Sequence, residues 1–301
     1  MIVEYSARSH VGRVRENNED NLFINGITLS PEMRERPFAI DGSTQFPAIF
    51  AVCDGMGGED SGEVASITAV QTLQQFSTQM KSSPSKTLNE IVGLYVEKTS
   101  QAILSQKEDV CSRTGTTLAL IVAKKNGLYC FNLGDSRIYS LQKSHCRQVT
   151  NDHTAMAEQV RANTSTGVNT GAGLSASTST TQPAINARSG HKLTRCIGIG
   201  SILPAQDYPP ITGKCRILIC SDGLTDMVKK AEIEHLLNIA DTTENAATSL
   251  LNAALKNGGK DNITVIVLEV KPAKRSFWSR LARRQSTDDE RQNRRKQTNA
   301  Q

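Results

Sequence analysis

The 301-residue chain lacks several features that would place it in particular classes of protein. Its apolar runs are all of strand length, so no segment is expected to span a membrane. Its first ten residues do not combine a basic stretch with a following apolar one, so no signal peptide is expected. Aromatic residues make up only 4%, but hydrophobic residues reach 38%, which is enough to build a core.

The cysteines do not form a pattern typical of disulfides or zinc sites. There are seven, an odd number, and no two of them are spaced as Cys-x-x-Cys. Cys53, Cys130 and Cys220 lie within apolar runs and are interpreted as small core residues. We therefore expect no disulfide framework, and a reducing compartment, the cytoplasm.

The net charge of +5 is concentrated at one end of the chain. Residues 274–301 hold nine of the 35 Lys and Arg residues and three of the 30 Asp and Glu residues, which leaves 26 basic and 27 acidic residues elsewhere. On charge grounds the body of the chain is not expected to bind nucleic acid. Residues 272–301 are predicted to be a disordered basic tail. Contact between its Phe277-Trp278 pair and an anionic membrane is the less favoured alternative.

The hydrophobic pattern predicts both strands and helices before this tail. Strand-length apolar runs occupy 48–53, 117–123, 128–133, 138–141, 216–220 and 263–268, with shorter ones at 3–7 and 22–24. Apolar residues spaced three or four apart predict helices in 61–80 and 88–103, and two more around 233–237 and 246–254. Short turns between strands favour antiparallel pairing. Residues 13–21 are interpreted as a hairpin loop, and 27–47, which contain three prolines, as a longer connection.

Residues 155–190 differ from their surroundings. No charged residue occurs from Ala162 to Ala187, where Ser, Thr, Gly, Ala and Asn dominate. Such low complexity predicts a mobile surface segment.

Acidic residues recur where the predicted strands begin or end. The run 48–53 leads into Asp54-Gly55-Met56-Gly57-Gly58, and the run 216–220 leads into Ser221-Asp222-Gly223. Glu19, Asp20, Asp135, Asp226 and Asp261 occupy similar positions. One such acid is usually a turn residue, but several that converge would repel one another unless cations are present. Oxygen ligands without Cys or His favour Mg²⁺ or Mn²⁺, and more than three carboxylates allow two ions suited to in-line attack of water on phosphorus.

Taken in order, these motifs resemble those of the metal-dependent Ser/Thr protein phosphatases of the PPM family, type 2C, in its compact bacterial form. The matching stretches are Arg15 with Asn18-Glu19-Asp20-Asn21, VCDGMGG (52–58), GTT (115–117), NLGDSRIY (132–139), NDHT (151–154), LTRCIG (193–198), CSDGLTD (220–226) and KDNITVIVL (260–268). The resemblance implies an α+β fold, a four-layer αββα sandwich of two antiparallel sheets flanked by helix pairs. It also implies that residues 1–271 form the phosphatase domain, with 155–190 as a flap-like insert beside the substrate groove.

The resemblance further implies roles for single residues. The implied metal ligands are Glu19, Asp20, Asp54, Gly55 through its carbonyl, Asp222 and Asp261, with Asp54 bridging two Mn²⁺ or Mg²⁺ ions. A third, weaker ion would use Asp135, Asp222 and Asp226. Arg15 matches the arginine that holds the substrate phosphate, a task for which two parallel guanidinium donors are suited. The implied catalytic reaction is hydrolysis of phosphoserine or phosphothreonine in proteins by a metal-bridging water, in opposition to a Ser/Thr kinase.

The chain departs from some members of this family at Met56, where they carry a histidine that can serve as general acid. Here the leaving group must be protonated by water or by another group. His153 is a candidate, although a turn or packing role is favoured for it. Two other functions stay open: hydrolysis of small phosphoesters or nucleotides, and non-catalytic binding of phosphopeptides, against which the intact acids argue. No oligomerisation signal is present, so a monomer is expected.

Overall fold

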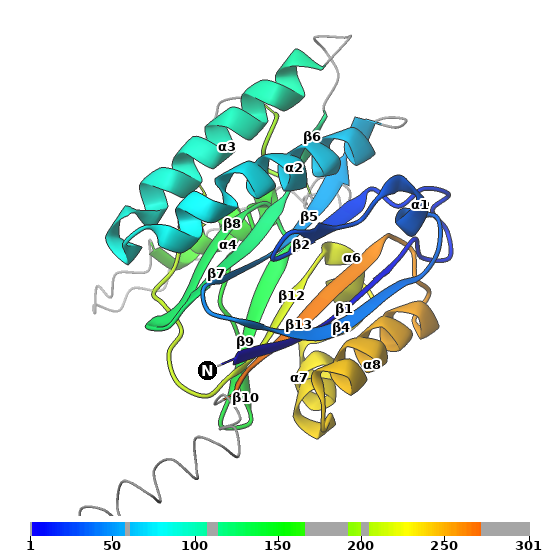
Figure 1. The fold of residues 1–301 in the computed structure, drawn as a ribbon. Coiled ribbons are helices and arrows are strands. Elements are labelled where there is room, and N and C mark those ends of the chain that lie inside the picture. Colours follow the sequence, from blue (N-terminus) through cyan, green and yellow to red (C-terminus); the bar gives the residue numbers. More distant parts are fainter. Residues whose placement is uncertain (1, 58–60, 107–113, 166–191, 200–204, 272–301) are drawn as a thin grey trace, which may run out of the picture.

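The computed structural model describes residues 2–57, 61–106, 114–165, 192–199 and 205–271. Two antiparallel β-sheets pack face to face, and helices cover the outer face of each (Figure 1). The predicted four-layer αββα sandwich is therefore confirmed. The predicted tail, 272–301, and most of the predicted insert, 155–190, lie outside the described residues.

The first sheet has six strands. Their order is β10 (His145–Gln148), β9 (Arg137–Gln142), β12 (Arg216–Cys220), β13 (Ile263–Lys271), β1 (Ile2–His10) and β4 (Phe38–Gln45). Helices α7 (Lys230–Ile239) and α8 (Thr243–Lys256) cover its outer face (Figure 1). Buried residues such as Leu218, Leu250 and Val265 fill the layer between this sheet and its helices.

The second sheet has seven strands. Its order is β11 (Gln206–Asp207), β8 (Gly127–Leu133), β7 (Leu118–Lys124), β5 (Ala48–Met56), β2 (Asp20–Ile24) and β3 (Ile27–Thr28), with β6 (Gly115–Thr116) beside the end of β5. Helices α2 (Ser61–Ser82) and α3 (Leu88–Ser105) cover its outer face (Figure 1). The apolar face predicted for α3 is buried. The face predicted for α2 is only partly right, because Val64 is 41% exposed while the small Ala65 and Ala69 face the sheet.

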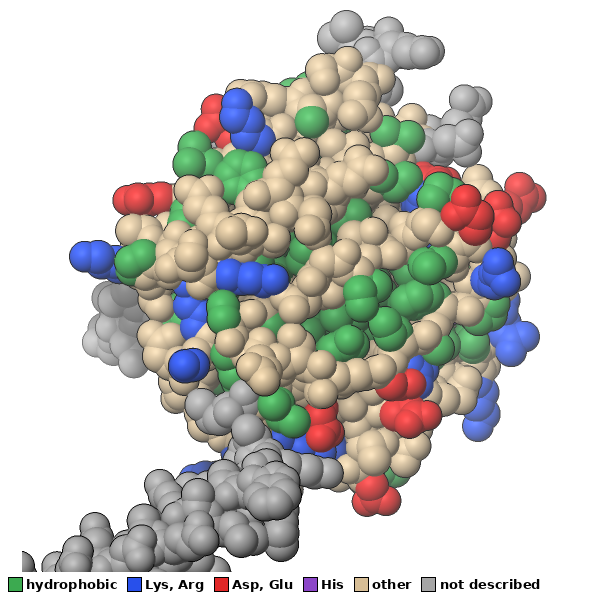
Figure 2. All heavy atoms as spheres, in the orientation of Figure 1, with side chains coloured by type: hydrophobic (Ala, Val, Ile, Leu, Met, Phe, Trp, Pro, Cys, Tyr) green, Lys and Arg blue, Asp and Glu red, His purple; other side chains and the backbone are tan. Residues whose placement is uncertain are grey.

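Side chains along each central strand alternate between the two layers of the core, as the pleat of a strand requires. In β5, Phe50 and Val52 face the opposite sheet, whereas Ile49, Ala51 and Cys53 face helices α2 and α3. Apolar side chains also gather on the surface in the region where the two sheets meet (Figure 2). The interpretation of Cys53 as a core residue is thus confirmed, and the same alternation directs the side chain of Asp54 between the sheets.

Two connections differ from the prediction made from sequence. Residues 13–21 were expected to form a hairpin loop, but β1 and β2 lie in different sheets, so this segment crosses from one sheet to the other. Residues 27–47 are not a plain connection, because they contain β3, the short helix α1 (Pro31–Arg34) and β4. Strand β4 leaves little hydrophobic signal because it is an edge strand with mostly exposed side chains, held by backbone pairing to β1.

Several short elements were not predicted from the sequence. These are the 3₁₀ turn η1 (Ser85–Thr87), helix α4 (Ala155–Ser165), helix α6 (Asp222–Thr225), and strands β6, β10 and β11. Helix α4 occupies the start of the segment expected to be mobile. None of the helices that the structure describes combines the length and the apolar character needed to cross a membrane.

Candidate active site

The predicted acids come together at one rim of the sandwich, between the two sheets. Asp20 opens β2 and Asp54 lies near the end of β5, and the two are directly paired across these antiparallel strands. Opposed residues of such a pair project to the same face of the sheet, which here is the face toward the other sheet. From that other sheet, Asp222 follows the end of β12 and Asp261 comes two residues before β13.

Asp20 is the most deeply buried of these acids. Its side chain is fully buried, and its Oδ2 accepts a hydrogen bond of 2.7 Å from Ser221 Oγ of the opposite sheet. Its Oδ1 has no hydrogen-bond partner among the described residues. Burial raises the pKa of Asp20 to about 7, and the nearby charges of Asp222 and Asp261 act in the same direction. An orphaned, buried carboxylate oxygen of this kind is suited to a cation.

Asp54 is held in place through its backbone. Its N–H donates to Thr117 Oγ1 at 2.9 Å, and its carbonyl oxygen accepts from the N–H of Thr117 and from the hydroxyl of Thr116. The Gly-Thr-Thr motif therefore fixes the end of β5, and with it the direction of the Asp54 carboxylate. Burial raises the pKa of Asp54 well above its usual range, and the charges of Asp222, Asp20 and Asp135 reinforce the rise.

Asp222 and Asp135 extend the cluster toward a small cavity. The pKa of Asp222 is raised to about 6. Burial is the largest cause, and the negative charge of Asp226 is the next largest. Burial also raises the pKa of Asp135 to about 8, with Asp222 as the next cause. A cavity of about 170 Å³ is lined by Asp135, Arg137, Asp152, Thr154, Met156, Ala157, Asp222 and Asp226. The three acids implied for a third ion thus share one cavity.

The chemistry of these acids fits divalent cations. Four carboxyl groups have raised pKa values because each is buried and lies near the negative charge of the others. A cation would offset both the burial of these negative charges and their mutual repulsion, and it would use oxygen ligands only. Among the described residues, however, no three His, Cys, Asp or Glu side chains already form a metal-binding group. The acids therefore lie close together without being arranged as a ready ligand sphere.

Glu19 and Gly55 lie where β5 comes close to the start of α2. The N–H of Gly55 donates to the carbonyl oxygen of Glu19 at 3.3 Å. A Cβ on Gly55 would collide with the carbonyl oxygen of Gly62, and a Cβ on Gly62 would lie 2.7 Å from the Glu19 carboxyl carbon. Glycine is therefore required at Gly55 by this close approach of backbones rather than by a turn, whereas a side chain at Gly62 would displace the Glu19 carboxylate. The carboxylate of Glu19 is in this way held against the first turn of α2.

The side chain of Asn262 holds the loop that carries Arg15 and Glu19, a role that was not predicted from the sequence. Its Oδ1 accepts from the N–H of Glu19 at 2.8 Å, and its Nδ2 donates to the carbonyl oxygens of Val11 and Asn17 at 2.9 Å. One amide side chain next to Asp261 thus holds the segment that crosses between the sheets. The only signal in the sequence was an asparagine beside an acid at a strand start, which is also common in turns.

Arg15 points at the acid cluster. Its Nη2 donates to Asp261 Oδ2 at 2.7 Å, and this hydrogen bond is the main reason why the pKa of Arg15 is raised. The charges of Glu19 and Asp54 raise it further. Its side chain is 53% exposed, so the guanidinium lies at the mouth of the site and not in the core. It already binds one oxyanion there, as a phosphate-binding residue must.

His153 is not placed to protonate a leaving group. Its side chain is 1% exposed, its Nδ1 accepts from the N–H of Gly134, and its own N–H donates to the Gly134 carbonyl oxygen. Gly134 has φ +97°, so this clamp stabilises the left-handed turn that presents Asp135. The favoured turn role is confirmed. Asp152 has a similar role, because its carboxylate accepts a forked pair of hydrogen bonds from Arg137.

Met56 lies beside the acid cluster and lines a second cavity, of about 480 Å³. Its other lining residues are Gly57, Lys192, Leu193, Thr194, Cys196 and Ile199. Met56 thus lines a cavity of mixed apolar and polar character two residues beyond Asp54.

The fold and the site together define a class of protein, a carboxylate-rich αββα enzyme with the chemistry of a cation-dependent hydrolase. Residues 38–257 match the family described as Protein phosphatase 2C. The chain belongs to this family and is a protein phosphatase.

Named relatives agree with this assignment. Serine/threonine phosphatase stp of Listeria innocua is 31% identical over 269 residues, which cover 87% of this chain and 94% of the relative. Serine/threonine protein phosphatase PstP of Mycobacterium tuberculosis is 29% identical over 272 residues, covering 90% of this chain and 45% of the relative. The crystal structure of M. tuberculosis PstP/Ppp superposes with a TM-score of 0.68 at 27% identity, covering 90% of this chain and 100% of that one. The PstP catalytic domain in complex with two manganese ions has a TM-score of 0.65 at 26% identity, covering 90% and 99%.

Proposed function

We propose that this phosphatase hydrolyses phosphoserine and phosphothreonine in proteins and that it needs Mn²⁺ or Mg²⁺ to do so. The observation that carries the proposal is the cluster of buried acids at the rim, whose pKa values are raised by burial and mutual repulsion. The names of the relatives support the Ser/Thr class, and the two manganese ions in one related structure support the metal.

In this proposal the acids hold two ions. The residues that would hold them are Glu19, Asp20, Asp54, the carbonyl of Gly55, Asp222 and Asp261. Asp135, Asp222 and Asp226 would hold a third, weaker ion. When bound, such ions acidify a coordinated water and offset the charge on the phosphoryl oxygens.

Other side chains of the protein would orient the acids and bind the substrate phosphate. Ser221 and Thr117 orient Asp20 and Asp54 through the hydrogen bonds described above. Arg15 would exchange its carboxylate partner for the substrate phosphate, because both present two oxygens to the guanidinium fork. With Met56 in place of a histidine and His153 buried, the leaving alkoxide would take its proton from water.

Removal of divalent cations tests the proposed activity. We expect the purified chain to hydrolyse a phosphothreonine peptide with Mn²⁺ or Mg²⁺ and to lose this activity in EDTA, as measured by phosphate release. Readdition of Mn²⁺ should restore it. Hydrolysis of nucleotides but not of phosphopeptides would overturn the assigned substrate class, and full activity in EDTA would overturn the role of the acids.

Replacement of Arg15 tests its proposed contact with phosphate. Arg15→Ala should lower kcat/KM on the peptide by about 100-fold, because one charged donor to the developing anion is lost. Arg15→Lys should recover only part of this loss, since lysine keeps the charge without the fork. Inorganic phosphate should also inhibit the alanine variant less strongly. Because the side chain is largely exposed, the melting temperature should not change. Unchanged kinetics and unchanged phosphate inhibition in Arg15→Ala would contradict this role.

We further propose 1–271 as the phosphatase domain, since β13, which ends at Lys271, lies between β12 and β1 within the sheet. A Ser/Thr kinase is the proposed counterpart, because a phosphatase of this class needs phosphorylated Ser or Thr as substrate. The six cysteines among the described residues are free thiols, which supports a reducing compartment such as the cytoplasm.

A further inference from the structure

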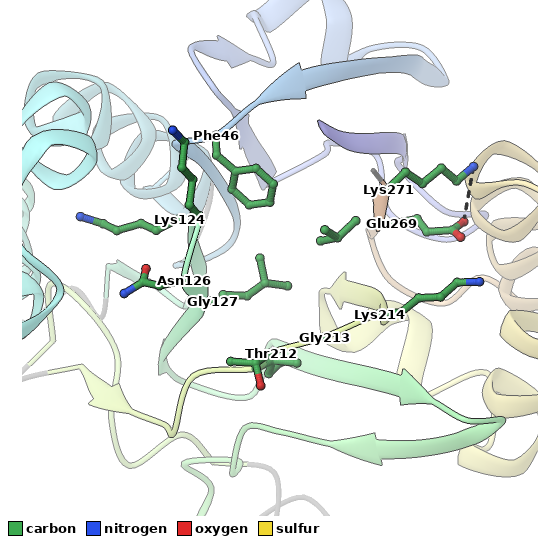
Figure 3. Close-up of a pocket in the computed structure, with 13 residues that line it drawn as sticks. Phe46, Lys124, Asn126, Gly127, Thr212, Gly213, Lys214, Glu269 and Lys271 are labelled. Atoms are coloured by element: carbon green, nitrogen blue, oxygen red, sulfur yellow. Dashed lines mark ion pairs between the residues drawn. The ribbon is translucent and has the colours of Figure 1, made fainter. Parts of the chain in front are cut away.

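A further cavity of interest, among the described residues, lies far from the acid cluster. It has a volume of about 700 Å³ and opens where β5 begins, where β7 turns into β8, and where β13 ends (Figure 3). The acids lie near the opposite ends of β5 and β13. Strand β5 begins at Ala48, beside the cavity, and Asp54 lies six residues further along it, a span of about 20 Å at the rise of a β-strand. This cavity is therefore separate from the phosphatase site.

The inner wall of the cavity is apolar. Phe46, Leu128, Ile211 and Val270 line it, and all four belong to or pack against the core between the two sheets. Leu128 is 3% and Ile211 is 8% exposed, so these two form the floor, while Phe46 and Val270 are only partly buried. In Figure 3, the hairpin residues Lys124, Asn126 and Gly127 lie on one side and Lys214, Glu269 and Lys271 on the other.

The rim of the cavity carries an excess of positive charge. Lys124, Lys125, Lys214 and Lys271 line it with a single acid, Glu269. That acid is paired with Arg216 at 3.2 Å and with Lys271 at 3.8 Å, and Lys271 is also paired with Glu4 at 2.6 Å, so the excess charge belongs to the other three lysines. No acidic residue of the described chain forms an ion pair with Lys125 or Lys214. These two exposed lysines flank the opening from its two sides.

We infer that this cavity binds a single small amphiphile with an anionic carboxylate head, of the fatty-acid type. The apolar floor would take the hydrocarbon chain, and a rim lysine, Lys125 on one side or Lys214 on the other, would take the head group. A volume of about 700 Å³ lies within the range of small-molecule sites, which are also mostly apolar with few polar groups. Charge complementarity excludes a cationic ligand and makes a neutral one weaker.

The shape of the surface favours a free amphiphile over a membrane. A membrane-docking surface presents apolar side chains that project into the lipid. The large apolar side chains that are exposed in the described chain are Val14, Ile27, Met33, Val64, Leu94, Leu104, Met156, Val160 and Ile239, and none of them lines this cavity. Its apolar residues are recessed behind the lysines instead.

Calorimetric titration of the full chain with decanoate tests the inference. We expect saturable binding of one decanoate, with much weaker binding of butyrate, which lacks the long chain, and of decyltrimethylammonium, which has the opposite charge. Amide NMR signals of Gly127 and Gly213 should shift with decanoate. Binding to phosphatidylglycerol vesicles without decanoate binding would overturn the inference in favour of a membrane surface. The absence of saturable binding to either would overturn it outright.

Matched charge reversals locate the site. The double variant Lys125→Glu/Lys214→Glu should bind decanoate at least about tenfold more weakly, because hydrogen bonds to charged groups are lost and repulsion replaces them. Phe46→Ala should weaken binding, because it removes part of the apolar wall of the cavity. Lys98→Glu/Lys256→Glu, which changes two exposed lysines on the outer helices, should not affect it. All of these variants should keep wild-type phosphatase activity and folding. Equal affinity in the rim variant and the control would place the decanoate elsewhere and contradict the inference.

Discussion

Asp54→Asn is expected to lower kcat/KM on a phosphothreonine peptide at least about a thousandfold. In the proposed site Asp54 is one of the acids that would hold the ions, so its loss would remove negative charge from the place where they bind. Metal ions supply several kcal/mol of transition-state stabilisation, and roughly 4 kcal/mol corresponds to a thousandfold in rate. The measurement is steady-state kinetics at saturating Mn²⁺, together with calorimetric titration of Mn²⁺.

The same substitution should not damage the fold. Asp54 is anchored to Thr116 and Thr117 through its backbone, and an asparagine leaves those hydrogen bonds intact. Asparagine also removes one of several buried like charges, so metal-free Asp54→Asn should be as stable as the wild type or more stable, by about 1 kcal/mol. Asp241→Asn, at an exposed position between α7 and α8, is the control and should change neither activity nor stability. An active Asp54→Asn variant, or one that is inactive because it is unfolded, would contradict this account.

Metal-free protein is expected to become less stable as the pH rises from 5 to 8. The pKa values of Asp222, Asp20 and Asp135 are raised to about 6, 7 and 8, and that of Asp54 is raised as well. Unfolded aspartates lose their protons near pH 4. Above that pH the folded chain binds more protons than the unfolded chain, so the free energy of unfolding falls until the folded pKa values have been passed. This direction is the reverse of that for acids stabilised by a salt bridge.

Urea unfolding in EDTA at several pH values measures this effect. Comparison with Asp54→Asn isolates the cluster, because all other titrating groups are common to both proteins. The variant should show a smaller fall in the free energy of unfolding than the wild type. Mn²⁺ at pH 7.5 should restore the wild type, since a ligand that binds only the folded state stabilises it. A wild type whose stability rises with pH to the same extent as that of the variant would show that the acids do not repel one another.

Local patterns were sufficient for much of the fold. The strand runs that lead into Asp54 and Asp222 were predicted correctly, because an apolar run followed by Asp-Gly is a signal contained within a few residues. Alternation along β5 then places Phe50, Val52 and Asp54 on one face. The positions of the main helices followed from their apolar spacing for the same reason. Edge strand β4 could not be found in this way, since backbone pairing holds it and leaves little trace in its side chains.

The arrangement of the rim depended on contacts between distant residues. The hydrogen bond from Ser221 to Asp20 spans 201 positions, and those from Asn262 to the loop before β2 span more than 240. No local rule assigns such partners, because they depend on which strands become neighbours. For the same reason the sequence alone did not predict the cavity at the far end of the sheets.

Taken by itself, the sequence determined that acids end several strands, that Met56 stands where a general acid is found in some relatives, and that the chain resembles the type 2C phosphatases. Only the tertiary structure decided that Asp20 and Asp54 are paired across β2 and β5, and that Arg15 meets Asp261. The physical reason is the distance along the chain over which each effect acts. Hydrophobic periodicity is set by neighbouring residues, whereas the distance between two charges on different sheets is set by how the whole sandwich packs.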